Sequence, residues 1–138
     1  MNLKVYYVSP KGCAEMVAET IARTCQCTKE PLLPAYMPER VPLMFIGCDG
    51  SKADKVTMDF INKLNKDRVH KAALFCCNSG LSDAPIAQMR AALTERGIPV
   101  VEEALVLPGK GLFGGKKPGD ADLAKAKTFA EACIAQIK

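Results

Sequence analysis

The sequence predicts an α/β domain in which a parallel sheet is covered by helices on both faces. Short apolar runs alternate with longer amphipathic stretches, which is the pattern of chains built from strand–helix–strand units. The apolar runs contain few polar residues, as is typical of strands buried on both faces. With 138 residues the chain is long enough for one sizeable core and too short for two, so we expect a single domain over residues 1–138.

Four strands are predicted from apolar runs, and they cover Leu3 to Val8, Leu43 to Cys48, Ala72 to Cys77 and Val100 to Leu107. A fifth strand is expected around Thr28 to Leu33. Three prolines follow Cys25 in the stretch that ends at Val41, and proline has no N–H group to donate to a neighbouring strand. The fifth strand should therefore be short and lie at the edge of the sheet.

Four helices are predicted from apolar residues that recur three and four positions apart. Their apolar stripes are Cys13, Met16, Val17 and Ile21; Val56, Phe60, Ile61 and Leu64; Ile86, Met89 and Leu93; and Leu123, Ala126, Ala130, Cys133 and Ile137. Start signals precede the last three helices: Ser51 with Asp54 is spaced as a capping box, Ser82 or Asp83 precedes Pro85, and Asp120 follows Pro118 and Gly119. Strands and helices thus alternate along the chain.

The composition excludes several classes of partner. A formal net charge of +4 is mild, and the basic residues are dispersed apart from Lys110, Lys116 and Lys117, so no nucleic-acid partner is expected. No apolar stretch approaches the roughly 20 residues that span a bilayer, and no basic leader precedes the first apolar run, so we expect neither a membrane location nor export. The seven cysteines are an odd number and lie mostly in apolar segments, which predicts a reducing cytoplasm.

The cysteines predict no metal site and no redox site. Cys25 and Cys27 could join Cys13 as zinc ligands, but a four-ligand spacing is missing, and the only histidine, His70, is expected at the start of a strand. A thiol oxidoreductase would carry a Cys-x-x-Cys motif, which is absent.

The loop from Ser9 to Ala14 is the predicted anion site. It joins a buried strand to a helix, so the N–H groups and the positive end of that helix would face a bound phosphate. Gly12 lets the backbone approach closely, and Lys11 adds a positive charge. The alternative is that Gly12 only makes a tight turn and Lys11 is solvated.

Two further loops are expected beside this one, because ligands of open parallel sheets bind at the carboxyl ends of the strands, where the winding reverses. These loops run from Asp49 to Asp54 and from Asn78 to Asp83. The candidate binding residues are Ser9, Pro10, Lys11, Gly12, Cys13, Ala14, Cys48, Asp49, Gly50, Ser51, Cys77, Asn78, Ser79, Gly80 and Leu81. The glycines Gly109, Gly111 and Gly114 have the spacing of a dinucleotide fingerprint, but no strand with an acidic residue follows them.

Three stretches resemble flavodoxins: VYYVSPKGCAEMVAETIA, LMFIGCDGSKADKVTMDFINKL and KAALFCCNSGLSDAPIAQMRAALTERGIPVVEEALVL. The closing GDADLAKAKTFAEACI is similar to the last helix of flavodoxin-like proteins. This resemblance implies an open five-stranded parallel sheet of order 2-1-3-4-5. It also implies noncovalent FMN, with the phosphate in the first loop and the ring between the next two, and electron transfer with a redox partner protein. It implies no catalytic residue.

The chain departs from the family pattern in the phosphate loop and in the two loops expected beside the flavin ring. Ser9 and Gly12 match the family's phosphate loop, whereas Lys11, Cys13 and Ala14 stand where that loop usually has Thr, Asn and Thr or Ser. There is no tryptophan, and the second and third loops hold no aromatic residue up to Ser51 and Leu81, so only Tyr36 or Phe113 could stack on the ring. The basic chain predicts a redox partner with an acidic docking face.

Two functions follow from these observations. The first is an FMN-binding electron carrier that exchanges electrons with a partner enzyme. The second is a flavodoxin-like module that has lost FMN and binds a protein, or an anion at Lys11. A small reductase acting on its own substrate is disfavoured, because no histidine or carboxylate pair is placed to move protons.

Overall fold

Five parallel strands form the centre of the molecule, in the order β2-β1-β3-β4-β5. This computed structural model describes residues 3–32, 40–109 and 118–137. The strands are β1 (Lys4–Val8), β2 (Lys29–Pro31), β3 (Met44–Asp49), β4 (Ala72–Cys77) and β5 (Leu105–Leu107). The predicted sheet and its order are therefore confirmed, with the proline-containing β2 at one edge.

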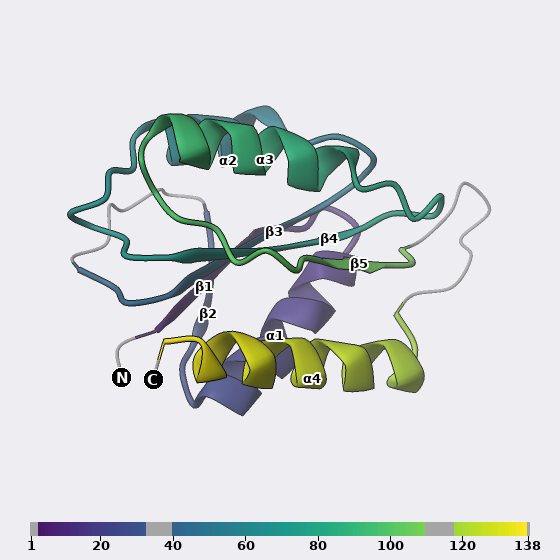
Figure 1. The fold of residues 1–138 in the computed structure, drawn as a ribbon. Coiled ribbons are helices and arrows are strands. Elements are labelled where there is room, and N and C mark those ends of the chain that lie inside the picture. Colours follow the sequence, from purple (N-terminus) through teal and green to yellow (C-terminus); the bar gives the residue numbers. More distant parts are fainter. Residues whose placement is uncertain (1–2, 33–39, 110–117, 138) are drawn as a thin grey trace.

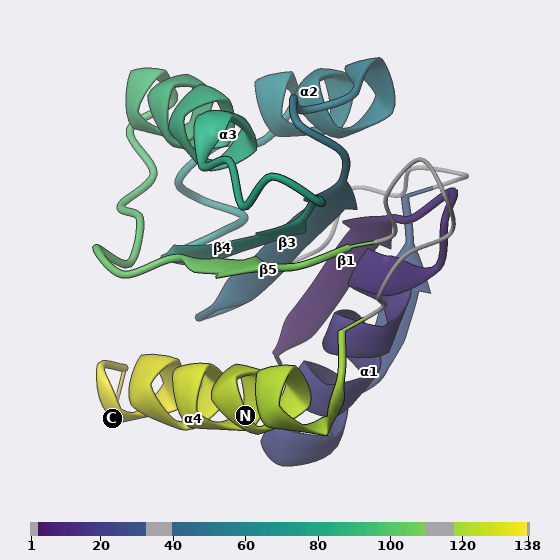
Figure 2. The same ribbon diagram turned by 90° about the vertical axis from the view of Figure 1, so that its right-hand side faces the viewer.

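Four helices cover the two faces of the sheet, as Figures 1 and 2 show. They are α1 (Cys13–Cys25), α2 (Lys55–Asn62), α3 (Ala84–Glu95) and α4 (Asp120–Ala135). One face is covered by α1 and α4, and the other by α2 and α3. Each helix buries most of the apolar stripe that the sequence predicted, while Met16, Val56 and Leu123 are half-buried. Leu64 and Ile137 lie just beyond the ends of α2 and α4.

The strands bury side chains toward both helical layers. Phe45 and Phe75 belong to the core beneath α1 and α4, where Phe45 meets Phe129 edge-on with ring centroids 6.0 Å apart. Tyr6 belongs to the opposite core, where its ring lies 5.1 Å from that of Phe60 of α2. Burial on both faces explains why these strands read as continuous apolar runs.

The register of the strands places three loops at one edge of the sheet. Val8 at the end of β1 pairs with Cys48 of β3, and Cys48 pairs with Cys76 of β4. The loops that leave these three strands are therefore neighbours. The chain order reverses at β1, since β2 lies on one side of it and β3 on the other, which is the arrangement that creates a ligand crevice in open α/β sheets.

The predicted strand from Val100 to Leu107 is wrong in extent. Val100 makes only an isolated bridge to Ala72, and the regular strand begins at Leu105. Between them the chain bends away from the sheet, and the guanidinium of Arg90 donates to the carbonyl oxygens of Val101 and Glu102 at 3.2 and 2.9 Å. These bonds satisfy carbonyls at the bend, where sheet pairing is interrupted.

The start of α2 also differs from the prediction. Its N-cap is Asp54, whose carboxylate accepts a hydrogen bond from the N–H of Thr57 at 3.0 Å, so Ser51 is not the first residue of a capping box. The last helix begins after Gly119, whose N–H donates to Asp122 at 3.0 Å. Leu33, Tyr36, Lys110, Gly111, Phe113, Gly114, Lys116 and Lys117, which the sequence singled out, lie outside the described residues.

We predict that Gly47→Ala in β3 destabilises the protein by about 1–3 kcal/mol, the usual cost of overpacking a core. A Cβ atom at Gly47 would overlap the ring of Phe75, which is fully buried and cannot move aside. Urea unfolding monitored by circular dichroism measures the change. The matched control is Gly80→Ala, where a Cβ atom meets nothing closer than 3.9 Å; equal losses at both positions would contradict this prediction.

Candidate functional site

A cleft of about 370 Å³ lies at the loop edge of the sheet, among the three loops that the sequence predicted. Nine predicted residues line it: Lys11, Cys13, Asp49, Gly50, Ser51, Cys77, Asn78, Ser79 and Gly80. Ser82 and Gly109 line it as well. The other predicted residues, which are Ser9, Pro10, Gly12, Ala14, Cys48 and Leu81, are not among its lining residues.

The carboxylate of Asp49 occupies the first loop. Its Oδ2 accepts hydrogen bonds from the N–H of Lys11 at 3.0 Å and from the hydroxyl of Ser9 at 2.9 Å. Its Oδ1 accepts from the N–H of Ala14 at 2.7 Å. The Asp49 residue is only 8% exposed, so this buried anion is held by the start of α1.

The rest of the first loop is bonded internally. The hydroxyl oxygen of Ser9 accepts from the N–H of Glu15 at 3.0 Å, and the carbonyl oxygen of Ser9 accepts from the N–H of Gly12 at 3.1 Å. Gly12 is left-handed, with φ of 83°, a conformation that side chains with a Cβ rarely adopt. Gly12 therefore makes the turn into α1.

This arrangement decides whether the loop fits a phosphate group. A phosphate at the start of α1 would use the same N–H donors that bind Asp49. Two like charges about 4 Å apart near a protein surface repel each other by about 4 kcal/mol. The first loop as it stands does not fit the phosphate of FMN, because the chain's own carboxylate holds the donors.

The backbone at the end of β3 directs Asp49 toward the loop. Asp49 is the last residue of β3, and the N–H of the next residue, Gly50, donates to the carbonyl of Cys77 at 2.9 Å. Gly50 has φ of 101°, so the chain turns away from the sheet at this point. The pairing of β3 with β1 then brings the Asp49 side chain beside Ser9.

The third loop is a rigid turn that displays Leu81. The Asn78 side chain accepts from the N–H of Ser82 at 2.7 Å and donates to the carbonyl of Ser82 at 2.9 Å. The N–H of Leu81 donates to the carbonyl of Asn78 at 3.2 Å. Leu81 is left-handed, with φ of 53°, and 57% exposed. A leucine in this conformation is strained, and strained residues cluster at functional sites.

Gly109 closes the cleft from a fourth segment. The N–H of Asn78 donates to the carbonyl of Leu107 at 3.1 Å, which brings the end of β5 against the third loop. A Cβ atom at Gly109 would lie 3.3 Å from the backbone of Cys77 and Asn78. Sequence reasoning noticed Gly109 only as part of a rejected motif; its role is to permit this close approach.

The cysteines near the cleft are structural. Burial raises the pKa of Cys48 and of Cys76 to about 12, and it also raises the pKa of Cys77. These thiols stay neutral at physiological pH and behave as small apolar side chains. Within the described segments, no three His, Cys, Asp or Glu side chains gather to hold a metal ion.

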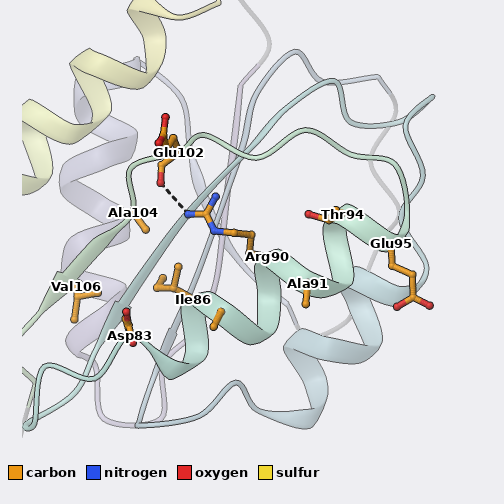
Figure 3. A pocket seen from close by; sticks show the side chains of 10 residues that line it. Asp83, Ile86, Arg90, Ala91, Thr94, Glu95, Glu102, Ala104 and Val106 are labelled. Atoms are coloured by element: carbon orange, nitrogen blue, oxygen red, sulfur yellow. Dashed lines mark hydrogen bonds between the residues drawn. The ribbon is translucent and has the colours of Figure 1, made fainter.

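A larger groove of about 860 Å³ lies between α3 and the segment from Glu102 to Val106 (Figure 3). Arg90 points across it toward Glu102, and its guanidinium is already engaged by backbone carbonyls. The other residues that line the groove include alanines and the exposed side chains of Asp83 and Glu95. The groove follows from the bend before β5, so the loop edge remains the better candidate site.

Known structures share this architecture along the whole chain. An archaeal flavodoxin superposes with a TM-score of 0.76 at 18% identity, and the match covers 99% of both chains. Flavodoxins 1 and 2 from Bacillus cereus superpose with TM-scores of 0.77 and 0.72 at 19% and 16% identity, again over 99% of both chains. The chain has a flavodoxin-like fold. No family model and no curated protein sequence matches it.

Flavodoxin-like chains of this identity share a fold, and the site must be judged from its own residues. Among the described lining residues of the cleft, no aromatic side chain is present to stack on a flavin ring. In the described part of the chain, no helix is both long enough and apolar enough to cross a membrane.

We predict that Asp49→Ala lowers the free energy of unfolding by about 2 kcal/mol, because it removes a charged acceptor and leaves the donors of Ser9, Lys11 and Ala14 without their partner. Asp49→Asn should cost less, since the amide oxygen still accepts. Chemical denaturation measures both. Asp59→Asn, on the exposed side of α2, is the control and should change stability by less than about 0.5 kcal/mol. A loss of stability at Asp59 as large as that at Asp49 would contradict the role assigned to Asp49.

Proposed function

We propose that this protein is a flavodoxin-like domain that has lost FMN and works by binding another protein at the loop edge of its sheet. The carboxylate of Asp49 in the first loop is the observation that carries this proposal. In a phosphate-binding loop, the helix start is left open for an external anion. Here an internal anion takes that place, and three hydrogen bonds retain it.

The cleft offers little to the flavin ring in compensation. Its described lining is made of small and polar side chains, including Gly50, Ser51, Ser79 and Gly80. An aromatic contact contributes on the order of 1 kcal/mol beyond area burial, which is about a fivefold change in affinity per contact. Loss of ring stacking therefore adds to the loss of the phosphate site.

The loop edge has features suited to a protein partner. Leu81 projects from a turn fixed by Asn78, so a partner could bury it without ordering a flexible segment. Lys11 and Lys52 are exposed on the first and second loops. Two exposed lysines on the loops next to that of an apolar anchor favour a partner with an acidic docking face.

An FMN-dependent electron carrier is the second candidate function. The superposition on flavodoxins over the whole chain and the cleft among the same three loops favour it. FMN would supply one-electron chemistry and a redox partner would receive the electrons. For this function the Asp49 carboxylate would have to leave the first loop.

A reducing compartment such as the cytoplasm suits either function, because none of the seven cysteines is in a disulfide.

The two candidates are separated by a titration with FMN. The purified protein should show no visible flavin absorbance, and it should not quench the fluorescence of added FMN. Asp49→Ser removes the negative charge and frees the donors of Lys11 and Ala14, so its affinity for FMN should exceed that of the parent at least tenfold, about 1.4 kcal/mol. The control is Asp54→Ser, which changes a neighbouring carboxylate that caps α2.

A parent protein that is isolated yellow, or that quenches FMN as tightly as Asp49→Ser, would establish the electron carrier instead. If Asp49→Ser binds FMN no more tightly than the parent, although circular dichroism shows that it is folded, the Asp49 carboxylate is not what excludes the phosphate.

Docking at the loop edge is tested with partners captured from the source lysate by flavin-free protein. Leu81→Ser and Lys11→Glu should each weaken capture of the same partner about tenfold or more, because one removes the apolar anchor and the other reverses a charge. Quantitative mass spectrometry reads the result. Lys125→Glu reverses an exposed charge on α4, which contributes no residue to the described lining of the cleft. It should leave capture unchanged, and an equal effect at Lys125 would show that capture depends on nonspecific charge.

A further inference from the structure

Two cysteines that the proposed function does not use lie at the end of α1. Cys25 is the last residue of the helix, and Cys27 follows Gln26. Gln26 is left-handed, with φ of 55° and ψ of 46°. The N–H of Cys27 donates to the carbonyl of Ala22 at 2.9 Å, which turns the chain back over the helix. The turn places Cys27 beside Cys25, near enough for the ionisation of each thiol to depend on the other.

Gln26, which makes this turn, is a residue type that rarely adopts the left-handed conformation. Glycine is the usual residue at such a left-handed helix end, because it has no Cβ to strain. Gln26 costs roughly 1 kcal/mol or more in that conformation. The turn that Gln26 makes carries Cys27 back over Ala22.

The two thiols differ in their surroundings. The hydrogen bond from Cys25, aided by the charge of Lys4, lowers the pKa of Cys27. That same bond and burial raise the pKa of Cys25. A thiolate is the attacking species in thiol–disulfide exchange, so Cys27 has the character of a nucleophile and Cys25 that of a resolving thiol.

Cys27 is open to small molecules. It lines a surface depression of about 340 Å³ together with Ala22, Arg23, Thr28 and Lys29. Cys25 and Cys27 are both partly exposed, whereas Cys13, Cys48, Cys76, Cys77 and Cys133 are buried. Because α1 starts at the loop edge, its last residue lies at the opposite end of the molecule from the cleft.

We infer that Cys25 and Cys27 form a dithiol site that reduces low-molecular-weight disulfides and is itself oxidised to a disulfide. The Cys27 thiolate attacks one sulfur of the small disulfide, giving a mixed disulfide and releasing one small thiolate. Cys25 gives up its proton and attacks the Cys27 sulfur, which releases the second small thiolate. Two electrons pass from the protein to the small disulfide, and the two thiolates released take up protons from the solvent.

The test uses the full chain, reduced and then incubated with glutathione disulfide under anaerobic conditions. Free thiols are counted in denaturant, and the peptides are mapped by mass spectrometry. The parent should lose two thiols and yield a Cys25–Cys27 disulfide. Cys25→Ser should stop at a glutathione adduct on Cys27, and Cys27→Ser should form no disulfide at this site. Cys76→Ala, the control in β4 at the opposite core, should behave as the parent does.

A second probe reports proximity without redox chemistry. Phenylarsine oxide bridges two thiols that lie close together, so the parent and Cys76→Ala should each bind it at this site, while Cys25→Ser and Cys27→Ser should not. The inference fails if the parent accumulates the glutathione adduct without closing the disulfide. It also fails if a buried cysteine reacts before Cys27, or if the arsenical does not bind. None of these outcomes depends on whether the distant cleft binds FMN.

Discussion

The structure depends on one buried ionic contact, between the carboxylate of Asp49 and the start of α1. A helix leaves its first N–H groups without internal partners, and their aligned dipoles attract an anion. Asp49 supplies that anion from the end of β3 and binds the N–H groups of Lys11 and Ala14. The contact joins the two central strands and the first helix at the point where the winding of the sheet reverses.

Because of this contact, a helix start that could bind an external anion binds a side chain of the protein instead. The first loop enters α1 through the left-handed Gly12, and its Lys11 and Ala14 donors are engaged by Asp49. The neighbouring third loop is equally fixed, since both ends of the Asn78 amide bond to Ser82. Loops held by such side-chain hydrogen bonds around a small cleft suit recognition by a partner surface better than enclosure of a large cofactor.

The two ends of α1 show the same physical principle with opposite outcomes. At its start, free N–H groups are satisfied by a carboxylate from another strand. At its end, free carbonyls are satisfied by the chain itself, through the left-handed Gln26 and the N–H of Cys27. The second solution places Cys27 beside Cys25, although a Cys-x-Cys spacing in the sequence does not by itself predict that the two thiols influence each other.

The sequence by itself determined the elements and the edge of the sheet where the loops meet, because burial on both faces needs apolar runs and amphipathic stripes that are visible locally. Only the tertiary structure decided what those loops bind. Asp49 was predicted at the cleft as a ligand residue, but its bonds to Ser9 and Ala14 join positions 40 and 35 residues apart. The bend before Leu105, set by Arg90, was invisible for the same reason. Hydrogen bonds between distant residues depend on strand register and side-chain reach, which composition and periodicity do not encode.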